Sequence, residues 1–257
     1  MKSIISQFFK AIYLYKRALK FVSHNKLLYF FLFPLIFNFL IYSLGLMFFD
    51  DTLENLKNSL INYFGNSLQF ENTIFNKFLT ISFWLMAKSF SIFFFSFFGG
   101  YLTIIAMSPV FTYLSEKTSS IINGITYNFN LTSFLKDLIR AILIAFRNVF
   151  IQFILMTILF IFGFFPLIGW PISILGNLLI SSYFYGFSFM DYSNERNRFS
   201  FSDSISLIRK NKGMAIGLGF VFYLSLFIPI IGGVVSSFLA IISVVSATIF
   251  MEEAKTI

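Results

Sequence analysis

Hydrophobic residues in this chain fall into long runs that no charge interrupts. Four runs contain no charged residue and make up more than half of the 257 residues: Leu27–Phe49, Ser89–Ser115, Asn148–Met190 and Gly213–Met251. Each is long enough to cross a bilayer once, because a spanning helix needs about 20 apolar residues. We therefore predict an all-α integral membrane protein.

The polar positions between the runs predict the order of the segments. In residues 1–26, apolar side chains recur at three- and four-residue steps between lysines, which predicts a cytoplasmic amphipathic helix along the membrane surface. A plain basic tail is the alternative. The chain then crosses the membrane at 27–49, forms an external segment at 50–77, and returns at 78–115 to a cytoplasmic segment at 116–147.

The last two runs are predicted to be hairpins, because basic segments flank each of them on both sides. Hairpin 1 covers 148–190 and hairpin 2 covers 213–251, with cytoplasmic residues at 191–212 and 252–257. Pro166 and Gly169 interrupt the first near its middle, as Pro229 and Gly232 interrupt the second. The four arms hold 16 to 19 residues. At about 1.5 Å per residue they are marginal for a core of about 30 Å, so full spanning and partial insertion both remain open.

Composition supports the membrane assignment. The chain is 58% hydrophobic and 12% charged, whereas soluble domains average about 45–50% apolar and about 25% charged. A soluble protein of this length cannot bury that excess, which excludes a soluble globular enzyme.

The net charge of +8 indicates orientation and not a nucleic-acid partner. Most of the 19 basic residues lie in the N-terminal segment, in 116–147 and in 191–212, while Lys57 and Lys77 lie in the predicted external segment. The positive-inside rule then places both termini in the cytoplasm. We expect the cytoplasmic (inner or plasma) membrane, with its lipid bilayer as a partner.

The residues give no indication of catalysis. There is no cysteine and His24 is the only histidine, so a cysteine or histidine metal cluster is excluded. No phosphate-binding glycine loop ending in Lys-Ser or Lys-Thr is present. The acids fall mainly in polar segments and form no evident buried pair for acid–base work. We expect no cofactor, no metal, no catalytic residue and no enzyme.

Three basic residues form a candidate anion site. On a helix, Lys136, Arg140 and Arg147 fall within about 40° of one another. This stripe could line a cytoplasmic vestibule that attracts anions, or it could bind lipid headgroups.

Polar and small residues within the apolar runs have two interpretations. Asn38, four residues after Pro34, could coordinate a permeating ion or bond a neighbouring helix. The same alternatives hold for Gln152 and Asn177. Gly213 and Gly217, one helical turn apart, favour a close helix contact.

A series of landmarks in fixed order carries a family resemblance. They are Phe33-Pro34 and Asn38, then Pro109, Glu116 and Gly124, then Lys136, Asp137 and Arg140, then Phe165-Pro166 and Gly169, then Asp191-Tyr192, then Arg209–Lys212, and last Ile228-Pro229. With these, the chain resembles the CysZ sulfate-permease family, which is related to the etoposide-induced 2.4 membrane proteins. The resemblance implies two long spanning helices and two shorter hairpins that enter the bilayer only partly. It makes Pro34, Asn38, Glu116, Pro166, Gly169, Asp191 and Pro229 structural or pore candidates.

The chain departs from that family at the expected anion site. The resemblance to the sulfate-permease branch implies a Gly-x-Arg-Arg stretch just before the proline of the first span. Here those positions are Lys26, Leu27, Leu28 and Tyr29, so both arginines are missing. Asn25 and Lys26 remain as anion-binding candidates, since a helix N-terminus beside a cation can still hold an oxyanion.

Two functions follow. The first is a permease or channel for an inorganic oxyanion, with sulfate uptake for sulfur assimilation expected from the resemblance. It would act as a homo-oligomer, because one chain with two full spans does not readily enclose a pore. The alternative is a non-transporting membrane-shaping or scaffold protein of the etoposide-induced 2.4 type.

Overall fold

The structure of the chain, a computed structural model, describes residues 3–37, 39–40, 55, 59, 81–82, 104–127, 131–165, 167–228 and 231–255. The chain divides into two compact units, Met1–Pro34 with Gly100–Ile257, and Leu35–Gly99. Part of the predicted span at 27–49 and most of the predicted span at 78–115 lie outside the described residues. The first unit contains both predicted hairpins and nearly all of the described helices.

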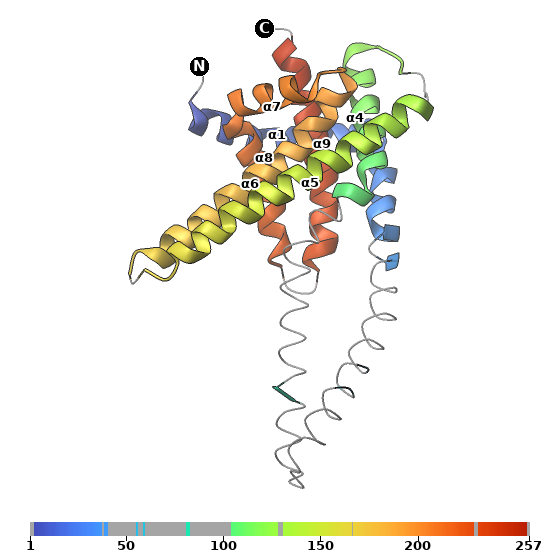
Figure 1. Ribbon diagram of the computed structural model, residues 1–257. Helices are drawn as coiled ribbons and strands as arrows, with labels where there is room; N and C mark the ends of the chain where they lie inside the picture. Colours follow the sequence, from blue (N-terminus) through green and yellow to red (C-terminus); the bar gives the residue numbers. More distant parts are fainter. Residues whose placement is uncertain are drawn as a thin grey trace. The chain divides into compact units, whose positions relative to one another are not determined.

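The described residues form helices and no strand. They are α1 (Ile4–His24), η1 (Leu27–Phe31), α4 (Ser108–Asn123), α5 (Leu131–Phe162), α6 (Gly169–Arg196), α7 (Phe201–Lys210), α8 (Lys212–Leu226) and α9 (Gly232–Lys255) (Figure 1). Among the described residues, three helical stretches are long and apolar enough to cross a membrane: Ile142–Phe162, Gly169–Arg196 and Gly232–Ala254. The prediction of an all-α membrane protein is confirmed.

Both apolar runs beyond residue 148 fold back on themselves. The first is the antiparallel pair α5 and α6, and the second is α8 and α9 (Figure 1). Gly169 begins α6 at the first tip, where a Cβ would lie 2.2 Å from the Phe162 carbonyl oxygen, so only glycine fits. The helices also extend into the polar segments, because α5 begins at Leu131 and α6 ends at Arg196.

The N-terminal segment is the predicted amphipathic helix, α1. Ser3 caps its start by accepting a hydrogen bond from the Ser6 N–H at 3.1 Å. One face of α1 is buried against α8 and α9, so only the other, exposed part of the apolar stripe is free to meet the membrane surface. Ile5 and Phe9 are 69% and 64% exposed. The buried face consists of Ala11, Leu14, Ala18 and Val22.

Glycines bring α8 into backbone contact with two neighbours. A Cβ on Gly213 would lie 2.2 Å from the Ile4 carbonyl oxygen of α1, and one on Gly217 would lie 2.8 Å from the Phe8 carbonyl oxygen. On the side toward α6, a Cβ on Gly219 would lie 1.8 Å from the Ser182 carbonyl oxygen. The predicted close contact at Gly213 and Gly217 is confirmed, and α1 is the partner.

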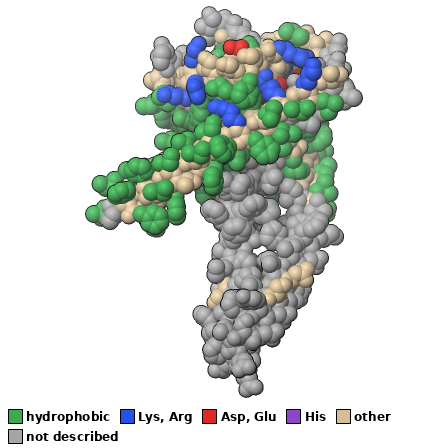
Figure 2. Space-filling view, in the orientation of Figure 1, with side chains coloured by type: hydrophobic (Ala, Val, Ile, Leu, Met, Phe, Trp, Pro, Cys, Tyr) green, Lys and Arg blue, Asp and Glu red, His purple; other side chains and the backbone are tan. Residues whose placement is uncertain are grey.

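The outer part of the α5–α6 hairpin extends away from the other helices of this unit (Figure 1). On the face that Figure 2 shows, its side chains are mostly apolar, and Leu167 and Trp170 at the tip are 96% and 73% exposed. Such a surface is stable only in an apolar environment, which is what the hydrocarbon core of a bilayer provides.

Candidate anion-binding and pore residues

The candidate residues Asn25 and Lys26 lie at the junction between α1 and η1. The Asn25 side-chain amide donates to the Phe21 carbonyl oxygen at 2.9 Å, so it caps the end of α1. Lys26 is exposed and adopts a left-handed backbone conformation with φ of 58°, which turns the chain into η1. Within the described residues, its ammonium has no ion-pair partner.

The predicted basic stripe on α5 is not a row of free cations. Lys136 is exposed, and no ion pair is formed by it within the described part of the chain. Arg140 instead binds Asp191 on α6, with 3.2 Å between Nη2 and Oδ1. The Arg147 guanidinium lies over the rings of Phe187 and Phe201, at 5.5 and 5.9 Å from their centroids. Two of the three cations therefore hold α5 against α6 and α7.

Asp191 lies at the centre of a buried polar cluster. Its carboxylate accepts from Arg140 and from the Ser204 hydroxyl of α7, and Ser204 in turn accepts from the Asn194 side-chain amide at 2.7 Å. Arg140 also donates to the Phe199 carbonyl oxygen in the turn before α7. This pairing satisfies a buried carboxylate and fixes α7 across the end of the hairpin.

A second buried cluster joins α4, α6 and α9 around Arg196. Its guanidinium pairs with Glu252 of α9 and donates to the Ser115 carbonyl oxygen at 2.8 Å and to Ser115 Oγ at 2.7 Å. The two charged side chains are only 1% and 4% exposed. Glu252 accepts two further bonds, from Ser119 Oγ at 3.1 Å and from Asn123 Nδ2 at 2.9 Å.

Hydroxyl groups connect the rest of this interface. Thr112 of α4 donates to Glu195 at 3.1 Å, and Thr248 of α9 lies 3.1 Å from both Ser115 Oγ and Ser193 Oγ. Asp191, Glu195 and Glu252 depart from the expectation that the acids lie mainly in polar segments, because all three are buried in helices.

The sequence pattern does not identify Glu195, Arg196 and Glu252 as buried, because the predicted hairpins end just before the first charged residue that follows each apolar run. One signal could have revealed them. Asp191 and Glu195 are one helical turn apart and continue the helix of the preceding apolar run, so both lie on one face of it. Such a face, with a basic residue next to it, is typical of a buried polar contact.

The remaining candidates divide into described and undescribed residues. Gly169 is at the tip of hairpin 1, and Glu116 is half-buried on α4. Pro34 is the last residue of Met1–Pro34, the N-terminal part of the first unit. Asn38, Pro166 and Pro229 lie outside the described residues.

Polar side chains also line the contact between α5 and α6. Gln152 Nε2 donates to Ser181 Oγ at 3.1 Å, and Asn148 Nδ2 approaches Ser188 Oγ at 3.4 Å. These bonds support helix packing as the role of Gln152. Asn177 differs, since its Oδ1 is buried and has no hydrogen-bond partner within the described residues.

A family model described as sulfate transporter CysZ/etoposide-induced protein 2.4 matches residues 14–236. The chain belongs to this family. The match begins within α1 and includes both hairpin turns, so most of the first unit of this CysZ/etoposide-induced 2.4 chain lies inside it. A search of curated proteins gave no match.

In this chain of the CysZ/etoposide-induced 2.4 family, the buried, ion-paired arginines and the exposed lysines have different chemical roles. Arg140 and Arg196 are neutralised by buried carboxylates and stabilise contacts between helices. Lys26 and Lys136 are exposed, so their charge is available to an anion in solution.

Proposed function

We propose that this chain is a membrane permease for a tetrahedral inorganic oxyanion, and that sulfate is its substrate. The observation that carries the proposal is the match to the sulfate transporter CysZ/etoposide-induced protein 2.4 model over residues 14–236. A membrane protein of this family, with most of its cations at one end, has the parts that anion uptake requires: a bilayer-embedded body and a basic face.

The distribution of side chains supports one orientation of the chain in the membrane. Basic residues gather at the end of the first unit where both termini lie, and the outer hairpin is apolar (Figures 1 and 2). By the positive-inside rule the basic end faces the cytoplasm, so both termini are cytoplasmic and the membrane is the cytoplasmic one. Transport by a homo-oligomer is part of the proposal.

Lys26 and Lys136 are the residues proposed to attract the anion. Both are exposed, and neither has an ion-pair partner within the described residues. Lys26 also stands immediately before the first helical turn of the apolar helix Leu27–Phe37, where backbone N–H groups have no intrahelical acceptor. A cation beside such amides favours an oxyanion even without the missing arginine pair.

The test is uptake of radiolabelled sulfate into proteoliposomes that contain the full chain. Uptake should exceed that of empty vesicles, and K26Q and K136Q should each lower it about two- to fivefold at low ionic strength, the size expected for an exposed charge. K20Q and K117Q are matched controls, since both lysines are equally exposed on α1 and α4.

Uptake no faster than in empty vesicles would overturn the proposal. Vesicle remodelling without sulfate flux would do the same and would support the membrane-shaping alternative. Uptake that K26Q and K136Q lower no more than the control variants do would overturn the assignment of these two lysines while leaving the permease in place.

A further inference from the structure

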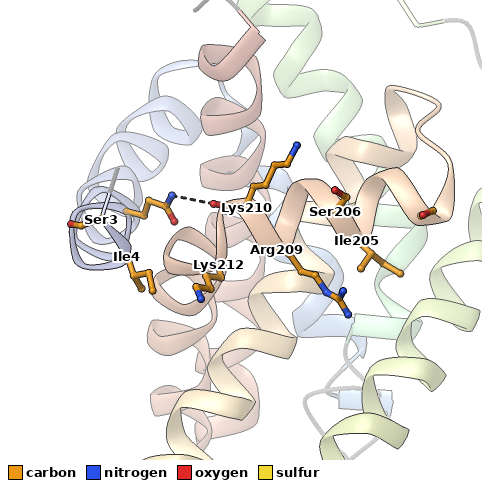
Figure 3. A pocket seen from close by; sticks show the side chains of 9 residues that line it. Ser3, Ile4, Ile205, Ser206, Arg209, Lys210 and Lys212 are labelled. Atoms are coloured by element: carbon orange, nitrogen blue, oxygen red, sulfur yellow. Dashed lines mark hydrogen bonds between the residues drawn. The ribbon is translucent and has the colours of Figure 1, made fainter. Parts of the chain in front are cut away.

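A basic pocket lies between the start of α1, α7 and the start of α8 (Figure 3). Its volume is about 920 Å³. The residues that line it are Ser3, Ile4, Gln7, Ser202, Ile205, Ser206, Arg209, Lys210 and Lys212. The lysines proposed to attract sulfate, Lys26 and Lys136, are not among them, so the pocket needs a separate explanation.

The pocket is lined by positive charge. Figure 3 shows that Arg209, Lys210 and Lys212 all extend from the α7–α8 junction. No acidic side chain is among the described residues that line the pocket. Within the described part of the chain, none of these three cations forms an ion pair. Two helices, α1 and α8, begin at the pocket, and α7 ends there at Lys210, so the two N-terminal dipoles outnumber the one C-terminal dipole.

Hydrogen bonds between α1 and the α7–α8 junction hold the pocket in shape. Gln7 donates through Nε2 to the Lys210 carbonyl oxygen at 3.3 Å and accepts the Gly213 N–H at 3.0 Å. The backbone that carries the three cations is therefore fixed against α1. The hydroxyls of Ser3, Ser202 and Ser206 supply further donors at the rim.

The size and surroundings of the pocket identify the kind of ligand. Pockets of about 300–1,000 Å³ enclose molecules much larger than a single tetrahedral anion. Two apolar side chains, Ile4 of α1 and Ile205 of α7, line the pocket together with the cations, and Ile4 is 47% exposed. A cationic site that adjoins exposed apolar side chains fits a ligand with a phosphate group and attached acyl chains, as at a membrane surface.

We propose that this pocket binds the phosphate headgroup of an anionic phospholipid. The cations and serine hydroxyls contact the phosphate, and Ile4 and Ile205 contact the first carbons of the acyl chains. The bound lipid holds α1 in the plane of the cytoplasmic membrane surface. This inference goes beyond the proposed transport function and does not depend on it.

The experiment measures lipid retention by the full chain, purified in detergent, in native mass spectrometry. Short-chain phosphatidylglycerol is the probe, and phosphatidylcholine of the same chain length is the neutral comparison. The triple variant R209Q/K210Q/K212Q removes the pocket charges. The matched control K16Q/K20Q/K117Q removes the same number of charges from exposed residues that do not line the pocket.

Wild type and the control variant should retain phosphatidylglycerol in preference to phosphatidylcholine. The pocket variant should retain it about a hundredfold less well at low salt, since each cation near an anionic lipid contributes about fivefold. Should the pocket variant fail to fold, S206W fills the pocket without a change in charge, and it must also lower retention.

Three results would overturn the proposal. Equal loss in the two triple variants would show attraction by overall charge alone. Equal retention of phosphatidylcholine and phosphatidylglycerol would show that the phosphate charge is not recognised. Binding of inorganic phosphate or sulfate that displaces the lipid and depends on Arg209, Lys210 and Lys212 would assign the pocket to a free oxyanion.

Discussion

The buried pair between Arg196 and Glu252 allows a quantitative test of the packing between α4, α6 and α9. Replacing Glu252 by Gln removes the negative charge and leaves the Arg196 guanidinium, 1% exposed, without its nearest counter-charge. The amide also places a donor where a carboxylate oxygen now accepts from Arg196 or from Asn123. Both effects act against the folded state.

The expected size follows from the burial of the two side chains. Breaking a buried ion pair by removing one partner destabilises a protein by about 3–5 kcal/mol. For a chain of about 250 residues, each kcal/mol corresponds to a shift of about 2–4 °C in the unfolding midpoint, so E252Q should lower it by about 6–20 °C. The assay is the temperature at which half of the detergent-solubilised protein is lost from the monodisperse size-exclusion peak.

The adjacent residue provides the control. Glu253 carries the same group one position along α9, but its side chain is 32% exposed, and its partners Lys10 and Arg17 are 30% and 44% exposed. Pairs that are this exposed contribute about 0–1 kcal/mol each, and E253Q breaks two of them, so it should shift the midpoint by at most about 8 °C and by less than E252Q does. Equal effects of E252Q and E253Q, or no effect of E252Q, would refute the reasoning.

A double variant separates charge from packing. Replacing both partners, as in R196M/E252M, removes the unpaired charge and fills the space with apolar atoms. Such replacements of buried pairs are often neutral or stabilising. The double variant should therefore be more stable than E252Q alone, and a double variant that is less stable would contradict the role assigned to the unpaired charge.

Two further predictions concern the helix contacts and the depth of the hairpins. G219A should sharply reduce the yield of monodisperse protein, because its Cβ would lie 1.8 Å from the Ser182 carbonyl oxygen. G176A is the control, because the nearest atoms to its Cβ belong to the flexible Leu159 side chain. A wild-type yield of both variants would contradict the close packing of α8 on α6. L167C and G233C, single cysteines in a chain that has none, should label with a lipid-soluble maleimide and not with an impermeant one, because apolar residues surround both tips. Ready labelling by the impermeant reagent from outside would show that the hairpins cross completely. Gly233 is preferable to Gly232, where a Cβ would lie 2.7 Å from the Leu226 carbonyl oxygen.

Much of the fold of the described unit follows from the sequence pattern. Charge-free runs broken near the middle by Pro and Gly predict the α5–α6 and α8–α9 hairpins, and the three- and four-residue spacing predicts α1. These features are local, because helical periodicity and turn residues are read within a few positions. The α8 helix has 15 residues, about 22 Å long, which keeps partial insertion of hairpin 2 open.

The buried charges could not be predicted in the same way. Glu252 and Glu253 are identical neighbours, yet one is buried against α4 and the other is only half-buried beside α1. Adjacent helical residues point about 100° apart, so only the position of other helices decides which one is buried. The same holds for the basic stripe on α5. The sequence shows that its residues share one face of a helix, but it does not show that the partners of Arg140 and Arg147 belong to α6 and α7.

The glycines of α8 restrict how this protein can move. Gly217 and Gly219 point about 200° apart on the helix, so α8 is held on opposite sides, by α1 and by α6, with backbone touching backbone. Sliding along either neighbour would force side chains into spaces that admit only a hydrogen atom. We therefore expect α1, α8 and the inner half of α6 to shift as one rigid body during any transport cycle. Any bending then falls to the outer arms of the hairpins.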